Sequence, residues 1–131
     1  MATEKVSYLD LTEAVKFHIL YMRKIGEIRI GVFDKNLIES ALVRPQQAAA
    51  YENADLIRQA ATLCFGLIKN HPWQGGNKRT ATFLTNLFLK RNGFKIAAQT
   101  SDLIEMVLAV ESDFWNVDEI ENWLRLHVEK R

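Results

Sequence analysis

Apolar side chains recur every three or four residues along most of this chain, which is the spacing of helices with one buried face. The pattern predicts helices over residues 9–25, 35–43, 53–69, 77–92, 101–110 and 117–129. The third of these is apolar on more than one face, which is typical of a central helix. The predicted fold class is therefore all-α, a compact bundle of about six helices.

Two segments depart from helical spacing. Residues 26–34 alternate polar and apolar side chains between glycines, which favours a short, flap-like extended segment. A helix–helix loop with a few buried side chains is the alternative. Residues 94–98 are also expected to be extended.

Capping residues and helix breakers set the predicted helix ends. Asp34 is a suitable N-cap for the second helix. Pro45 is expected to end that helix near Val43, because the residue before a proline is pushed out of helical dihedrals. Residues 46–51 are expected to be only partly helical. Gly93 suits the left-handed position that follows a helix C-terminus.

Composition places the chain among ordinary globular proteins. It has 131 residues, 48% hydrophobic and 25% charged, as expected for one domain over residues 1–131. A net charge of +1 argues against a general nucleic-acid-binding protein. The one cysteine, Cys64, excludes an internal disulfide and is expected in the core. No signal peptide or membrane-spanning run is recognisable, and a cytoplasmic location is expected.

Residues 71–79, His-Pro-Trp-Gln-Gly-Gly-Asn-Lys-Arg, form a loop that leads into a predicted helix. A helix N-terminus attracts anions through its free N–H groups and its dipole. Gly75 and Gly76 permit a close approach of the backbone to a ligand. Asn77 is a suitable N-cap for the helix. The loop is therefore a candidate phosphate-binding site.

The charges around this loop sharpen the prediction. Residues 56–101 include seven Lys and Arg side chains and no Asp or Glu, a formal charge of +7. Lys78 and Arg79 fall in the first helical turn, where cations interact unfavourably with the helix dipole. They are therefore poor choices for helix stability alone and good ones if phosphates bind there. His71 is near enough to act as a general base. The alternative is a Gly-Gly turn with a surface histidine and two solvated bases.

These nine residues resemble the core motif of the Fic/Doc family, H-x-F-x-(D/E)-(A/G)-N-(G/K)-R. Trp73 stands at the phenylalanine position and Gly76 at the Ala/Gly position, and the ending Asn77-Lys78-Arg79 matches the Doc-like toxin branch. The resemblance extends over residues 11–96. It implies a Fic-type helical domain with the motif loop between central helices at about 53–70 and 77–92. It also implies a packing role for Trp73.

The resemblance implies a transferase that modifies a protein. In the family the motif histidine, here His71, accepts a proton from a target hydroxyl. The helix N-terminus holds the phosphates of ATP or another nucleoside triphosphate, with Mg²⁺ as the accompanying cation. Lys78, together with Thr82 in place of the arginine that ends the longer Fic motif, is similar to the Doc branch, which transfers the γ-phosphate.

In the Doc-like branch the target is translation elongation factor Tu, and the consequence is growth arrest. A Phd-like antitoxin neutralises such toxins with a disordered C-terminal segment that folds on binding. Both proteins are therefore the expected partners. Two alternatives stay open: a protein adenylyltransferase, which transfers AMP, and a catalytically degenerate Fic fold that binds a nucleotide or a partner.

One position departs from the family. Gly75 stands where the acidic residue that holds Mg²⁺ belongs, so no metal ligand is assigned from the motif. Any protein ligand must come from a distant segment, and activity is expected to be weaker, metal-independent or lost. His18, in the first predicted helix, is expected to be partly exposed and is assigned no role.

Overall fold

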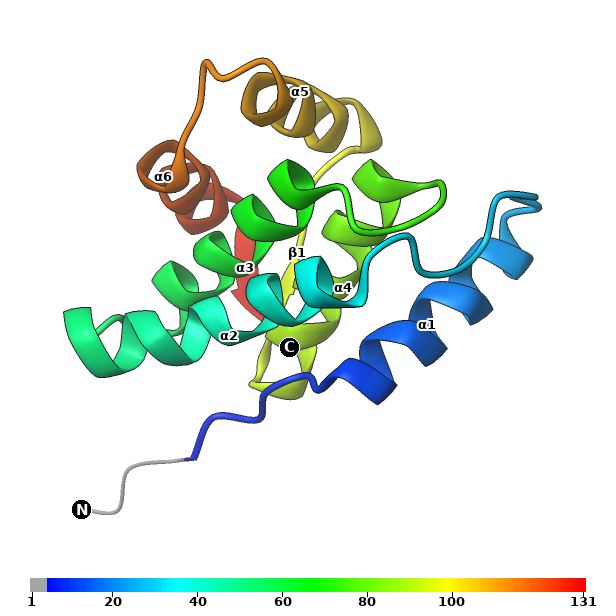
Figure 1. Cartoon of the computed structure of the whole chain (residues 1–131). Coiled ribbons are helices and arrows are strands. Elements are labelled where there is room, and N and C mark those ends of the chain that lie inside the picture. Colours follow the sequence, from blue (N-terminus) through cyan, green and yellow to red (C-terminus); the bar gives the residue numbers. More distant parts are fainter. Residues whose placement is uncertain (1–4) are drawn as a thin grey trace.

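The computed structural model describes residues 5–131, which fold into six helices and one short two-stranded sheet (Figure 1). The elements are α1 (Leu11–Lys24), α2 (Lys35–Glu52), α3 (Leu56–Asn70), α4 (Asn77–Arg91), β1 (Phe94–Ile96), α5 (Thr100–Glu111), α6 (Val117–His127) and β2 (Val128–Lys130). The all-α fold class is confirmed. None of the helices within these residues is long and apolar enough to cross a membrane.

Helix α3 is the centre of the core, as its sequence predicted. It packs against α2, α4, α5 and α6, and in Figure 1 it lies between α6 on one side and α1 on the other. Leu63, Cys64 and Leu67 are buried there. Burial raises the pKa of the Cys64 thiol to about 12, so this cysteine stays a neutral thiol and acts as a small apolar core residue.

The short sheet joins the end of α4 to the C-terminus. Strands β1 and β2 pair antiparallel, with Phe94 opposite Lys130 and Ile96 opposite Val128. The prediction of an extended segment after Gly93 is therefore confirmed. The last helix ends two residues earlier than its apolar spacing predicted, because residues 128–130 form β2.

The prediction that Pro45 ends the second helix is wrong. Helix α2 continues through Pro45 to Glu52 and ends at Asn53, which has left-handed dihedrals (φ 53°, ψ 38°). Proline cannot donate the helical hydrogen bond. Here the loss is offset by packing, because Pro45 is buried together with Ala41 and Ala48. Helix α3 then begins at Leu56, three residues later than predicted, with Asp55 as its N-cap.

The segment between α1 and α2 lies against the loop of residues 71–79, which we call the motif loop. Val32 forms an isolated antiparallel bridge with Trp73. Two backbone hydrogen bonds of 2.9 Å extend the contact, from Phe33 N to Pro72 O and from Gln74 N to Gly31 O. The flap-like segment at 26–34 is thus confirmed, with its extended part confined to residues near Val32.

Candidate functional site

The motif loop connects the C-terminus of α3 to the N-terminus of α4. His71 is the C-cap of α3 and has left-handed dihedrals (φ 47°, ψ 55°), which turn the chain out of the helix. The amide of Asn77 closes the loop, since its Oδ1 accepts from Trp73 N at 3.0 Å and its Nδ2 donates to Trp73 O at 3.1 Å. The loop therefore has a fixed shape.

The N-cap of α4 is Gly76 and not Asn77, which corrects the sequence prediction. Gly76 has φ +65°, a conformation that side chains strain, and a Cβ there would collide with the Met22 side chain. Asn77 is instead the first helical residue, and its side chain is used to close the loop. The α4 N-terminus is left open to a ligand, because no side chain caps it.

A cavity of about 370 Å³ lies over this helix N-terminus. It is bounded by the motif loop, the flap and the end of α5, through Glu27, Arg29, His71, Gln74, Gly75, Gly76, Asn77, Lys78, Arg79 and Glu111. The structure thus brings all the predicted catalytic and phosphate-binding residues to one cavity. Trp73, for which the resemblance implied a packing role, is buried in the core.

Glu111, at the end of α5, is a site residue that the motif did not reveal. Its Oε2 lies 3.4 Å from His71 Nε2, and its Oε1 lies 3.2 Å from Lys78 Nζ. All three side chains are partly exposed, so the contacts add little to stability. Their effect is on position and charge, since Glu111 holds the imidazole and the ammonium group at the same wall of the cavity.

His18 is fully buried, and the prediction of a partly exposed residue without a role is wrong. The backbone N–H of Gly31 donates to its Nε2 at 3.1 Å. The other ring nitrogen, Nδ1, therefore carries the proton and donates to Thr80 Oγ1 at 2.9 Å. The ring stacks on Trp73 with centroids 4.1 Å apart. Burial lowers the pKa of His18 to about 4, so the imidazole is neutral.

The indole of Trp73 shows how tightly this region is packed. Within residues 5–131, its buried Nε1 has no hydrogen-bond partner. Such an orphaned donor costs about 1–3 kcal/mol. A phenylalanine at the motif position has no such donor. Stacking on His18 is the contact through which Trp73 fits the core.

Cations outnumber carboxylates in the cavity. Arg29, Lys78 and Arg79 line it together with the two carboxylates of Glu27 and Glu111. The backbone N–H of Arg29 lowers the pKa of the Glu27 carboxyl, and the charges of Arg29 and Arg79 lower it further. Together with the α4 N-terminus, this arrangement favours an anion with several negative charges.

The donor set does not fit a metal ion held by protein ligands. Gly75 offers no side chain, and residues 5–131 contain no group of three or more His, Cys, Asp or Glu side chains arranged for a metal. Distant segments do supply carboxylates, Glu27 and Glu111, but each lies beside a cation. The groups that line the cavity are therefore mainly cations and backbone N–H donors.

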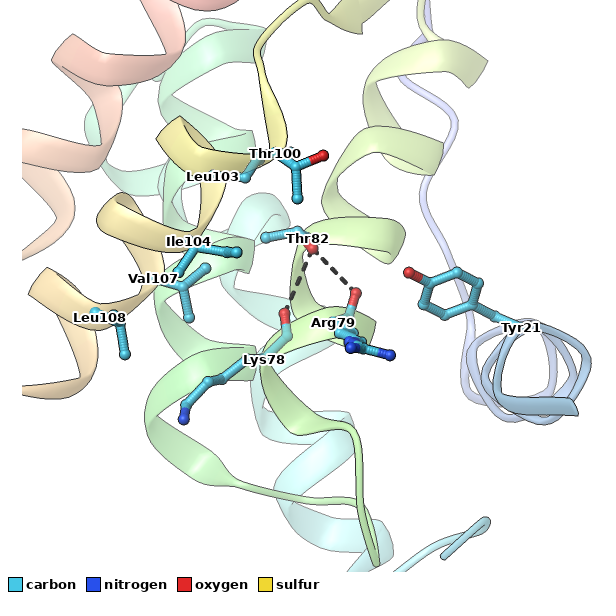
Figure 2. Close-up of a pocket in the computed structure, with 9 residues that line it drawn as sticks. All are labelled: Tyr21, Lys78, Arg79, Thr82, Thr100, Leu103, Ile104, Val107 and Leu108. Atoms are coloured by element: carbon cyan, nitrogen blue, oxygen red, sulfur yellow. Dashed lines mark hydrogen bonds between the residues drawn. The ribbon is translucent and has the colours of Figure 1, made fainter. Parts of the chain in front are cut away.

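A second cavity, of about 490 Å³, shares two lining residues with the first. Apolar side chains of α5 line one side, Tyr21 of α1 faces them, and the first turn of α4 lies between (Figure 2). Its lining residues are Tyr21, Lys78, Arg79, Thr82, Thr100, Leu103, Ile104, Val107 and Leu108. Lys78 and Arg79 border both cavities, so an occupant of the second cavity would lie beside the first.

Comparisons with known proteins agree on one family. Residues 8–89 match the model of the Fic/DOC family. The chain is 27% identical over 119 residues to "Protein kinase doc" of Escherichia phage P1, covering 90% of this chain and 93% of that protein. It is 34% identical over 95 residues to "Toxin Doc" of Mycolicibacterium smegmatis, covering 67% of this chain and 72% of that protein.

A solved structure shows the same fold. The N-terminal Fic domain of a cell filamentation protein from Bartonella quintana superposes with a TM-score of 0.52 at 17% identity. The match covers 84% of this chain and 54% of that structure, so the chain spans about half of its length.

Proposed function

The chain belongs to the Fic/DOC family, in its Doc-like branch, and we propose that it transfers a phosphoryl group from a nucleoside triphosphate to a hydroxyl group of a target protein. One observation carries this proposal: His71 shares a single cavity with Lys78, Arg79 and the open N-terminus of α4. This arrangement supports His71 as a base beside a phosphate-binding site. The name of the phage relative, a protein kinase, supports the same reaction.

The proposed reaction uses the side chains in distinct roles. Lys78, Arg79 and the α4 N-terminus bind the phosphates. The imidazole of His71 accepts the proton of the target hydroxyl, whose oxygen attacks the γ-phosphorus. The bond between the γ-phosphorus and the bridging oxygen breaks, and the nucleoside diphosphate leaves with that electron pair. Glu111, 3.4 Å from His71 Nε2, stabilises the imidazolium that results.

Labelled ATP distinguishes this reaction from its alternatives. Purified protein is incubated with elongation factor Tu, the proposed target, and with γ-labelled or α-labelled ATP in parallel. We expect label on the target from γ-labelled ATP alone. Label from α-labelled ATP would instead show adenylyl transfer. Nucleotide binding without label from either would show a degenerate fold that only binds.

The second cavity supports a partner that covers the site. Ile104 and Leu108 on α5 are exposed apolar side chains, and the basic Lys78 and Arg79 border the same groove (Figure 2). An amphipathic helix with apolar and acidic positions fits such a groove. We propose that it is the C-terminal segment of a Phd-like antitoxin, which folds on binding and blocks the approach to His71.

Expression in a bacterial host tests this partner. The chain expressed alone is expected to arrest growth, and co-expression of the neighbouring gene product is expected to relieve the arrest. The variant Ile104→Lys is expected to arrest growth but to resist relief, because a charge enters the apolar side of the groove. Normal growth at high expression of the parental chain would contradict both the proposed toxin activity and the proposed antitoxin.

A further inference from the structure

Arg29 of the flap occupies the space beside Gly75. A Cβ built on Gly75 would lie 2.7 Å from Arg29 Cβ, 2.8 Å from Arg29 O and 3.3 Å from Arg29 Nε. Gly75 is not among the glycines with positive φ, so its dihedrals do not require glycine. Glycine is required at position 75 because Arg29 approaches it so closely. A side chain at position 75 and the observed flap exclude each other.

Arg29 also adds a third cation to the cavity. Its side chain is 71% exposed, and its nearest acidic contact is Glu27, with Nε 3.9 Å from Oε1. That distance is longer than a hydrogen bond, so the guanidinium is free to turn toward an anion. A guanidinium binds two phosphate oxygens at once through its planar set of donors. Arg29 thus lines the same cavity as Lys78 and Arg79.

We propose that Arg29 supplies the positive charge that a metal ion would otherwise bring, so that this chain binds nucleoside triphosphate without a divalent cation. The inference rests on the proposed function, because it assumes that the cavity binds phosphates. Two independent observations carry it. Among residues 5–131, the carboxylates that line the cavity are Glu27 and Glu111, and both lie beside cations. Gly75, where the family resemblance would put a metal-binding carboxylate, has no room for a side chain because of Arg29 itself.

Calorimetric titration with ATP tests the proposal without measuring transfer. Affinity is measured in EDTA and in Mg²⁺ for the parental chain and for Arg29→Ala. We expect the parental dissociation constant to differ less than about threefold between the two conditions. In EDTA, Arg29→Ala is expected to weaken binding about tenfold or more, because a charge-assisted phosphate contact is lost.

Two matched variants control for charge and for folding. Arg29→Lys keeps the positive charge but not the paired donors, so in EDTA it is expected to bind ATP more tightly than Arg29→Ala and more weakly than the parental chain. Arg23→Ala removes an exposed arginine of α1 that does not line the cavity and is expected to bind as the parental chain does. Parental binding that requires Mg²⁺, or Arg29→Ala binding like the parent in EDTA, overturns the inference and leaves the proposed function standing. No binding in either condition overturns the proposed function and the inference with it.

Discussion

Replacing His71 with asparagine is expected to slow phosphoryl transfer about 10²–10⁴-fold, the range found when a general base is lost. Of the described residues, 5–131, His71 is the one that brings an imidazole to the cavity. Asparagine is preferred to alanine because position 71 has left-handed dihedrals (φ 47°), which asparagine tolerates better. The measurement is the initial rate of transfer from γ-labelled ATP at saturating nucleotide.

Two controls separate the loss of a base from damage to the site. Affinity for ATP is expected to stay within about threefold of the parent, because the phosphate contacts come from Lys78, Arg79 and the α4 N-terminus. His127→Asn changes a histidine of α6 outside the cavity and is expected to transfer at the parental rate. If His71→Asn keeps more than about a tenth of the parental rate, His71 is not the base.

The site residues that could be predicted from the sequence are those that lie next to one another along the chain. A loop that enters a helix places its glycines, its first-turn cations and the preceding histidine within a few residues of each other, whatever surrounds them. Local spacing was therefore enough to select His71, Gly75, Gly76, Lys78 and Arg79, which all line one cavity. Apolar periodicity was likewise enough to predict that the six helices exist, because each buries at least one face.

The residues that were missed belong to other elements. Glu111 ends α5, Arg29 belongs to the flap, and His18 lies inside α1. No local pattern marks them, since an exposed glutamate or arginine and a helical histidine are ordinary in sequence. Only the packing of α1, the flap and α5 around α4 brings them to the motif loop.

The C-terminal end of helix α2 was predicted wrongly for a related reason. The rule that a proline ends a helix describes the backbone alone. In α2 the buried positions on either side of Pro45 pack in the core, and that tertiary gain outweighs the local preference.

Replacing His18 with alanine is expected to destabilise the chain by about 3–5 kcal/mol, as large-to-small changes in a packed core do. The imidazole is fully buried and stacked on Trp73. Its removal leaves a cavity and also strips the Gly31 N–H and the Thr80 hydroxyl of their partner. The measurement is urea unfolding at pH 7.

The pH dependence of the free energy of unfolding tests the burial of His18 independently. The folded chain keeps His18 neutral down to a pKa of about 4, whereas an unfolded histidine binds a proton below about pH 6.5. The unfolded state therefore binds more protons, and stability falls as the pH is lowered from about 6.5 toward 4, by about 3 kcal/mol in all.

His18→Gln keeps a polar side chain that does not titrate, so its stability should fall less over this interval. The carboxyl of Glu13, whose pKa is lowered chiefly by its hydrogen bond with Arg91, contributes equally to both chains and cancels in the difference. Parallel stability curves for the two chains between pH 4 and 7 would show that His18 is not the buried neutral group that joins the flap to the motif loop.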